Sequence, residues 1–213
     1  MSTKAFLFDF DGTIADTLPY YIKAYRRALD TIGFPGKTDK EIVELCFGKK
    51  EQTVCDTLKV PDKVLEFSDS YFKAVRELFP DAPLIPGALE LLTTLKERSI
   101  KIAIITFAYR WYIDSMLQHY SLTNIIDAVV STDDVAKPKP DPEAVHQVCK
   151  LFSVTPQECL VIGDSKSDIA MAKSAGSGSI LVHLPSYELF YDLDILKASN
   201  PDQIVSSLTE ISI

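Results

Sequence analysis

The sequence predicts an α/β protein with a doubly wound parallel-sheet core, interrupted by an inserted α-helical domain. Short apolar runs of strand length alternate with helix-like segments over most of the chain, which is typical of a parallel sheet with helices on both faces. One long stretch near the N-terminus contains no convincing strand. Polar clusters recur at the predicted strand ends, where ligands bind in open α/β sheets.

The core elements follow from apolar runs and from turn and cap signals. The predicted strands are Ala5–Phe10, Ile100–Thr106, Ala128–Ser131, Cys159–Gly163 and Ser179–Leu184. The predicted helices are Gly87–Arg98, Tyr109–Tyr120, Asp141–Phe152 and Ser167–Ala175. Gly176 is a natural C-terminal cap for the last of these helices. We expect one more short helix after Leu184.

The inserted domain is expected over residues 15–83, which leaves residues 1–14 and 84–213 as the α/β core. Apolar residues recur at helical spacing in Tyr20–Leu29, Ile42–Cys46 and Val64–Phe79. A proline-rich stretch containing Pro80, Pro83 and Pro86 ends the segment. The pattern therefore predicts a helical insertion after the first strand.

Composition excludes several classes of function. The chain has 213 residues, 46% of them hydrophobic, and a net charge of −8 without a basic stripe, so we expect no nucleic-acid partner. Its apolar runs fall short of the ~20 residues that span a bilayer, so we expect no membrane partner. The first residues lack the layout of a signal peptide, which favours a cytoplasmic location. Four cysteines without C-x-x-C spacing favour buried free thiols, and we expect a monomer or homodimer.

Four polar clusters at strand ends carry the predicted chemistry. Carboxylates crowded at one sheet edge repel by about 4 kcal/mol per pair at ~4 Å and an effective dielectric of 20, so a cation is required. Carboxylate oxygens suit Mg²⁺, and a lysine could hold an anion on the other side. Such a site fits phosphoryl transfer through a carboxylate nucleophile and a second carboxyl as acid and base. The clusters contain Asp9 with Asp11, Thr106, Lys137, and Asp164 with Asp168.

In this order the clusters resemble the haloacid dehalogenase superfamily. The matching segments are DFDGT (9–13), the strand-terminal Thr106, KPKPDP (137–142) and GDSKSDIAMAKSAG (163–176). The resemblance implies that Asp9 is the nucleophile and a Mg²⁺ ligand, and that Asp11 is the general acid and base and gives its backbone carbonyl to the metal. It also implies that Thr106 and Lys137 hold the phosphoryl oxygens, that Asp164 is the third protein ligand, and that Asp168 orients a metal-bound water or the lysine.

Some of these residues could have other roles. Lys139 is a rival for the role of Lys137; the motif alignment favours Lys137, and we expect Lys139 to be solvent-exposed. Asp168 could also cap the helix that follows it. Phe107 stands where the family often has Asn or Ser, which removes one polar contact to the phosphoryl group, and we expect Phe107 to contact substrate. Ala136 replaces a frequent Gly.

The helical insertion resembles the mobile cap of the branch that contains phosphoglycolate phosphatases and β-phosphoglucomutases. In that branch the cap closes over the site and contacts the leaving group of the substrate. The loop with Gly48, Lys49 and Lys50 resembles the cap loop that helps choose substrate, although such lysines are often only a solvated turn.

The favoured function is a Mg²⁺-dependent phosphatase of small phosphorylated metabolites, similar to phosphoglycolate phosphatase. A β-phosphoglucomutase-like sugar phosphate mutase is the nearest enzymatic alternative. A haloacid dehalogenase lacks the second motif aspartate, so Asp11 argues against that activity. A catalytically silent binding protein would typically have lost a motif carboxylate, and this chain keeps all four.

Overall fold

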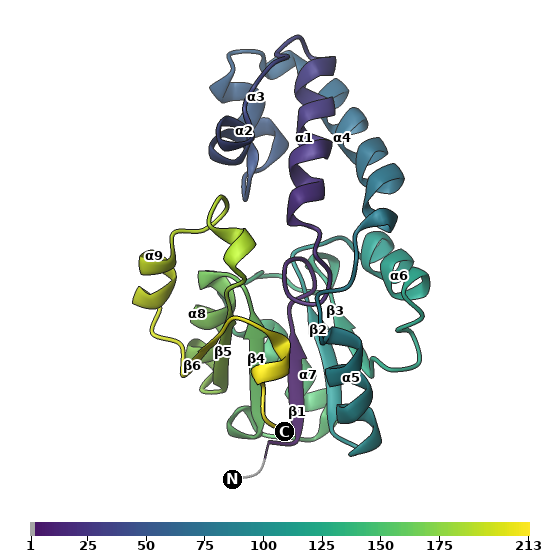
Figure 1. Ribbon diagram of the computed structural model, residues 1–213, viewed down its shortest axis with the longest axis vertical. Coiled ribbons are helices and arrows are strands. Elements are labelled where there is room, and N and C mark those ends of the chain that lie inside the picture. Colours follow the sequence, from purple (N-terminus) through teal and green to yellow (C-terminus); the bar gives the residue numbers. More distant parts are fainter. Residues whose placement is uncertain (1–2) are drawn as a thin grey trace. The chain divides into compact units, whose positions relative to one another are not determined.

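The computed structural model describes residues 3–213, and the chain forms two compact units. The core unit runs to Asp16 and resumes at Leu84, and the inserted unit is Thr17–Pro83. The first boundary lies two residues later than the sequence pattern indicates, and the second lies at the expected position. Figure 1 shows both units, each of which has its own secondary structure.

The core unit is built on a six-stranded sheet in the order β3-β2-β1-β4-β5-β6, and every neighbouring pair is parallel. Its strands are β1 (Ala5–Phe8), β2 (Lys101–Ile105), β3 (Ala128–Val130), β4 (Cys159–Gly163), β5 (Gly178–Val182) and β6 (Gln203–Val205). The doubly wound fold is confirmed. Because the strand order reverses between β1 and β4, the carboxyl ends of these two strands adjoin at the switch point where such folds bind ligands.

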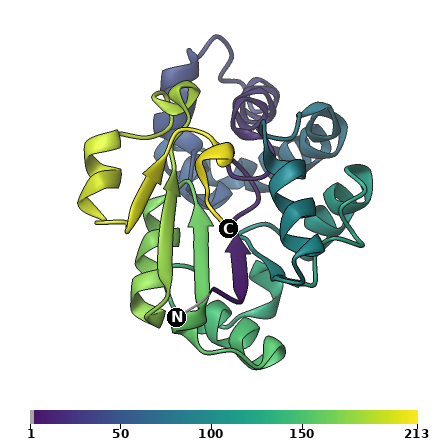
Figure 2. The same ribbon diagram turned by 60° about the horizontal axis from the view of Figure 1, so that its bottom comes forward.

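Helices cover both faces of the sheet (Figures 1 and 2). The core helices are α5 (Ala88–Glu97), α6 (Arg110–His119), α7 (Glu143–Phe152), α8 (Lys166–Ala175) and α9 (Leu193–Ala198). Alternate strand residues such as Leu7 and Val161 pack with Val148 of α7 and Met171 of α8 in one cluster. The intervening residues, such as Phe6, are buried on the opposite face, as the two-residue period of a strand requires.

The inserted unit, residues 17–83, consists of helices joined by loops and contains no strand, and the structure describes all of these residues. Its helices are α1 (Leu18–Thr31), α2 (Asp39–Cys46), α3 (Glu51–Thr57) and α4 (Val64–Leu78). Helices α1 and α4 pack side by side, with the rings of Tyr25 and Tyr71 stacked at 4.6 Å between centroids. Thr38 begins α2 with a reciprocal capping box to Glu41.

Short 3₁₀ helices occur in both units, at Pro61–Lys63, Phe79–Asp81, Thr132–Asp134, Pro156–Glu158, Pro185–Tyr187 and Leu208–Glu210. Among the described helices, none combines the length and the apolar character needed to cross a bilayer. The four cysteines are free and buried, as the absence of paired spacing predicts.

Candidate active site

The turn after β1 brings two aspartates to the sheet edge. The Asp9 amide still donates to the Ile162 carbonyl of β4 at 2.8 Å, so Asp9 continues the strand pairing. Gly12 then adopts a left-handed conformation with φ 79°, which a glycine accepts without steric cost. The Asp11 carboxylate is half-buried and accepts a 2.6 Å hydrogen bond from the hydroxyl of Tyr112 on α6.

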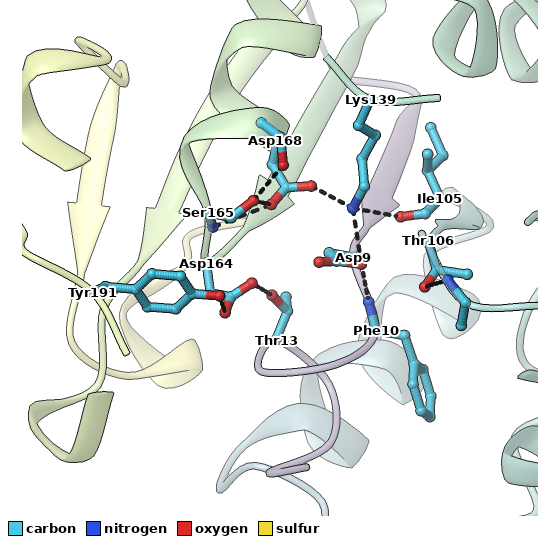
Figure 3. Close-up of polar contacts among 12 residues, drawn as sticks. Asp9, Phe10, Thr13, Ile105, Thr106, Lys139, Asp164, Ser165, Asp168 and Tyr191 are labelled. Atoms are coloured by element: carbon cyan, nitrogen blue, oxygen red, sulfur yellow. Dashed lines mark hydrogen bonds and ion pairs between the residues drawn. The ribbon is translucent and has the colours of Figure 1, made fainter. Parts of the chain in front are cut away.

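Lys139 lies at the centre of the site (Figure 3). Its ammonium is 3.0 Å from Asp9 Oδ1 and 2.7 Å from Asp168 Oδ1, and it donates a third hydrogen bond of 3.3 Å to the Ile105 carbonyl at the end of β2. The Lys139 side chain is only 2% exposed. A buried ammonium is stable here because each of its three donors has an acceptor.

The expectation for the two lysines is wrong. Lys139, expected to face solvent, is the buried cation, whereas the Lys137 side chain is 74% exposed and its ammonium lies 4.0 Å from Asp141. Both lysines precede a proline in the repeat Lys-Pro-Lys-Pro, so their immediate sequence gives little basis for choosing between them. Only the path of the loop toward Asp168 distinguishes them, and nothing local in the sequence reports that path.

Two further aspartates follow β4. Asp164 is 1% exposed, and it accepts a 2.7 Å hydrogen bond from the Tyr191 hydroxyl and a long one of 3.4 Å from the Thr13 hydroxyl. Asp168 accepts from the Ser165 amide and hydroxyl at 3.1 and 2.6 Å, which caps α8. It also accepts a hydrogen bond from Lys139, and not from the expected Lys137, so helix capping and contact with the buried lysine coexist.

Gly163, the last residue of β4, allows Asp168 to approach. A Cβ atom at residue 163 would lie 2.3 Å from Asp168 Cγ, well inside van der Waals contact. The glycine therefore creates the space in which the Asp168 carboxylate meets Lys139.

The acidic cluster has the composition of a site for a hard divalent cation. Asp9, Asp164 and Asp168 each offer a carboxylate oxygen, and these oxygens lie within 4.8 Å of one another. Burial raises the pKa of Asp9 to about 7, opposed by Lys139 and reinforced by the charges of Asp168 and Asp11. Burial, and then repulsion by Asp9 and Asp168, raises the pKa of Asp164 well above its usual range. Ionised Asp9 and Asp164 therefore need positive charge beyond Lys139, and their oxygen donors fit Mg²⁺.

The end of β2 forms another wall. Thr106 is 5% exposed; its amide donates to the Val130 carbonyl at 3.0 Å, and its hydroxyl accepts from the Ala108 amide at 3.0 Å. The Phe107 ring is half-exposed, and the Lys139 ammonium lies 5.0 Å from its centroid. Figure 3 shows Thr106 beside Asp9, and Phe107 lies against Lys139, so both residues border the acidic cluster, as their place at a strand end predicts.

The predicted cap loop lies in the inserted unit. Gly48 has φ 69° and follows the end of α2, Lys49 donates to the Glu44 carbonyl at 2.6 Å, and Lys50 directly precedes α3. Contact of these three residues with substrate stays a prediction.

Tyr112 and Tyr191 were not identified from the sequence. Each donates to a motif aspartate, but Tyr112 lies 101 residues from Asp11 along the chain. Tyr191 follows Asp164 by 27 residues, in the irregular segment between β5 and α9. Neither belongs to a cluster at a strand end, so no pattern in the chain pointed to them.

Comparisons with known proteins agree with this geometry. Residues 6–182 match the family model described as haloacid dehalogenase-like hydrolase. A phosphorylated carbohydrates phosphatase of Thermotoga maritima is 29% identical over 98% of this chain and 99% of its own length. A phosphoglycolate phosphatase of Vibrio vulnificus strain YJ016 is 28% identical over 98% of this chain and 94% of its own length.

A solved structure of another protein has a fold similar to that of this chain. It is a hydrolase from Pseudomonas syringae, which is 25% identical and superposes over 100% of both chains with a TM-score of 0.78. The family match covers the turn after β1, the buried lysine and the acidic residues after β4, which are the parts from which the site is built. The chain belongs to the haloacid dehalogenase-like hydrolases.

Proposed function

We propose that this protein is a Mg²⁺-dependent phosphatase that hydrolyses small phosphate monoesters through an aspartyl-phosphate on Asp9. The observation that carries the proposal is that protein donors engage one oxygen of the Asp9 carboxylate and leave the other oxygen facing the site. Its Oδ1 accepts the Phe10 amide at 2.8 Å and lies 3.0 Å from the Lys139 ammonium. Figure 3 shows its second oxygen directed toward the side of the site where Asp164 lies, which leaves that oxygen available for attack.

The reaction needs two displacements at phosphorus. In the first, an Asp9 oxygen forms a bond to phosphorus while the bond to the ester oxygen breaks, and Asp11 gives its proton to the departing alkoxide. In the second, Asp11 takes a proton from water, the water oxygen attacks phosphorus, and the bond to Asp9 breaks. The products are an alcohol and inorganic phosphate, and both aspartates return to their starting states.

Positive charge must offset the phosphoryl oxygens. Lys139, rather than Lys137, is the cation that lies beside Asp9, and Thr106 offers a hydroxyl at the neighbouring strand end. Asp9 and Asp164 would hold the Mg²⁺ together with the Asp11 backbone carbonyl, and these are the three protein ligands that the resemblance implies. The bound ion would supply further neutralisation of the phosphoryl group.

The substrate class follows from the relatives. Phosphorylated carbohydrates and phosphoglycolate are what the named relatives act on. Both are small anionic monoesters with a polar leaving group. We propose substrates of this class for this chain.

The test is a phosphate-release screen over sugar phosphates and phosphoglycolate, with Mg²⁺ and with EDTA. We expect release that requires Mg²⁺ and is lost in Asp9→Asn, because the amide cannot donate the attacking oxygen. Asp30→Asn, an exposed aspartate of the inserted unit, is the matched control and should turn over like the unmodified protein. Release that EDTA leaves intact, or that Asp9→Asn retains, would contradict the proposal.

A further inference from the structure

Each candidate metal ligand has one oxygen held by a protein donor at 3.0 Å or less. Asp9 Oδ1 is engaged by the Phe10 amide and by Lys139. Asp164 Oδ2 accepts the 2.7 Å hydrogen bond of Tyr191, whereas its Oδ1 accepts, among the described residues, only the long hydrogen bond of 3.4 Å from Thr13.

Asp168 differs from the two ligands. Its Oδ1 is held by Lys139 at 2.7 Å, and its Oδ2 by the Ser165 amide and hydroxyl at 3.1 and 2.6 Å. With both oxygens engaged, Asp168 is unsuited to bind an ion directly. The cluster therefore offers an ion two carboxylates, each through one oxygen.

We propose that Tyr191 is a positioning residue that keeps Asp164 monodentate and so makes the site select Mg²⁺ over Ca²⁺. This inference rests on the metal site of the proposed function. It adds a determinant of ion selectivity that lies outside the motifs at the strand ends.

The physical reason is the difference in coordination between the two ions. Mg²⁺ demands near-ideal octahedral geometry, keeps several waters and is satisfied by one or two carboxylates. Ca²⁺ takes six to eight oxygens and often binds a carboxylate through both of them. A phenol that occupies Oδ2 and fixes the rotation of the carboxylate removes the bidentate mode, which costs Ca²⁺ more than Mg²⁺.

Three donors from the described residues engage the two ligands at 3.0 Å or less: the Phe10 amide, the Lys139 ammonium and the Tyr191 hydroxyl. Lys139 is the cation beside the proposed nucleophile, so Tyr191 is the donor that a side-chain substitution removes without altering the backbone or that cation. The Phe10 donor is a main-chain amide, which no side-chain substitution deletes. The Tyr191 ring packs against the cluster of Ile169, Leu181 and Leu196 and makes an edge contact of 6.4 Å with the Tyr187 ring. Phenylalanine at residue 191 keeps these ring contacts and loses the hydroxyl.

The experiment measures Mg²⁺ and Ca²⁺ dissociation constants by isothermal titration calorimetry on the full chain after EDTA treatment and dialysis. In Tyr191→Phe we expect the ratio of the Ca²⁺ constant to the Mg²⁺ constant to fall about 10-fold, the lower end of what loss of a partner of a metal ligand typically causes. Tyr187→Phe is the matched control, because it also removes a buried tyrosine hydroxyl from this segment. Among the described residues, no hydrogen bond joins the Tyr187 hydroxyl to Asp164. The ratio in Tyr187→Phe should stay that of the unmodified protein.

An unchanged ratio in Tyr191→Phe would overturn the inference, as would an equal change in both tyrosine variants. Melting temperatures without metal check that the variants fold, and Tyr191→Leu replaces Tyr191→Phe if the latter does not. An unmodified protein that binds neither ion would overturn the metal site together with this inference. An unmodified protein that binds Mg²⁺ selectively but releases no phosphate would overturn the phosphatase proposal alone.

Discussion

At the scale of single residues, the site depends on how one buried ammonium is shared. Lys139 satisfies Asp9, Asp168 and the Ile105 carbonyl together. Asp9 and Asp164 could be identified from the sequence because each directly follows a strand, and Asp11 and Asp168 because they lie a few residues further on in the same clusters. The buried lysine could not, because Lys137 and Lys139 both precede a proline in one short repeat and tertiary packing decides which of them is buried.

We expect Lys139→Met to lower the rate of phosphate release by about 10²–10³-fold, because a fixed positive charge beside the nucleophile is lost. It should also destabilise the fold at pH 8 by about 3 kcal/mol, since Asp9 and Asp168 lose their buried partner. Lys137→Met, the matched control on the exposed lysine, should change neither rate nor stability appreciably. Steady-state phosphate release and urea unfolding measure both effects, and equal losses in the two variants would contradict the assignment.

The raised pKa of Asp9 predicts a pH dependence of stability in the metal-free protein. Its pKa rises from 3.8 to about 7 through burial, so the folded state binds a proton that the unfolded state releases between these values. Stability should therefore fall as pH rises from about 4 to 7. Asp9→Asn removes this titration, so in EDTA it should melt above the unmodified protein at pH 8 and close to it at pH 4.

Melting curves by differential scanning calorimetry, recorded in EDTA at several pH values, check this difference. The difference between the two proteins isolates Asp9, because Asp164 titrates in both. Parallel pH profiles for the two proteins would show that Asp9 is already ionised in the metal-free fold.

At the scale of elements, five strands and the main helices could be predicted because their apolar periods are clear. Strand β6 was missed, since Gln203–Val205 is three residues long and only Val205 of it is buried. Helix α3 was missed as well, because Glu51–Thr57 buries only Val54 and Cys55. Both elements are specified by the surfaces on which they pack, which a local pattern does not contain.

Gly163, at the end of β4, leaves the space that the Asp168 side chain occupies. Gly163→Ala should destabilise the protein by about 1–3 kcal/mol, as overpacking of a filled interior does, because the new Cβ meets Asp168 at 2.3 Å. It should also weaken Mg²⁺-dependent turnover, since displacing Asp168 releases Lys139.

The matched control is Gly178→Ala on the neighbouring strand β5. There the added Cβ lies 3.0 Å from the flexible end of the Leu160 side chain, which can move. Thermal unfolding of the two variants tests the comparison. If Gly163→Ala proved as stable and active as Gly178→Ala, the close approach of Asp168 would not be essential.

At the scale of the whole molecule, the insertion leaves and re-enters the core at adjacent points. Ala15 forms an antiparallel bridge with Leu84, and the Ile85 amide donates to the Ile14 carbonyl at 2.9 Å. The core therefore closes on itself without the inserted unit. The helical character of residues 17–83 could be predicted from periodicity, but this closure depends on pairing between distant residues that no local signal marks.

Replacing Thr17–Pro83 by a short Gly-Ser linker should leave a folded core, because the linker joins ends that are already paired and loop closure of a few residues costs little. Circular dichroism should show a folded protein with both helices and strands, and the shortened protein should bind Mg²⁺ as tightly as the full chain does. Phosphate release should become less selective among substrates if the inserted unit contributes to their choice. A core that fails to fold would show that the inserted unit is required for its stability.

The three acceptors around Lys139 have a spectroscopic consequence. Every ammonium hydrogen is already engaged, so an incoming phosphoryl oxygen gains one only by displacing a present acceptor. The contact to the neutral Ile105 carbonyl is the longest of the three, at 3.3 Å, and is the one most easily released. A ¹³C label in that carbonyl would then turn its vibrational frequency into a direct optical readout of occupancy, without any change to the chemistry of the pocket.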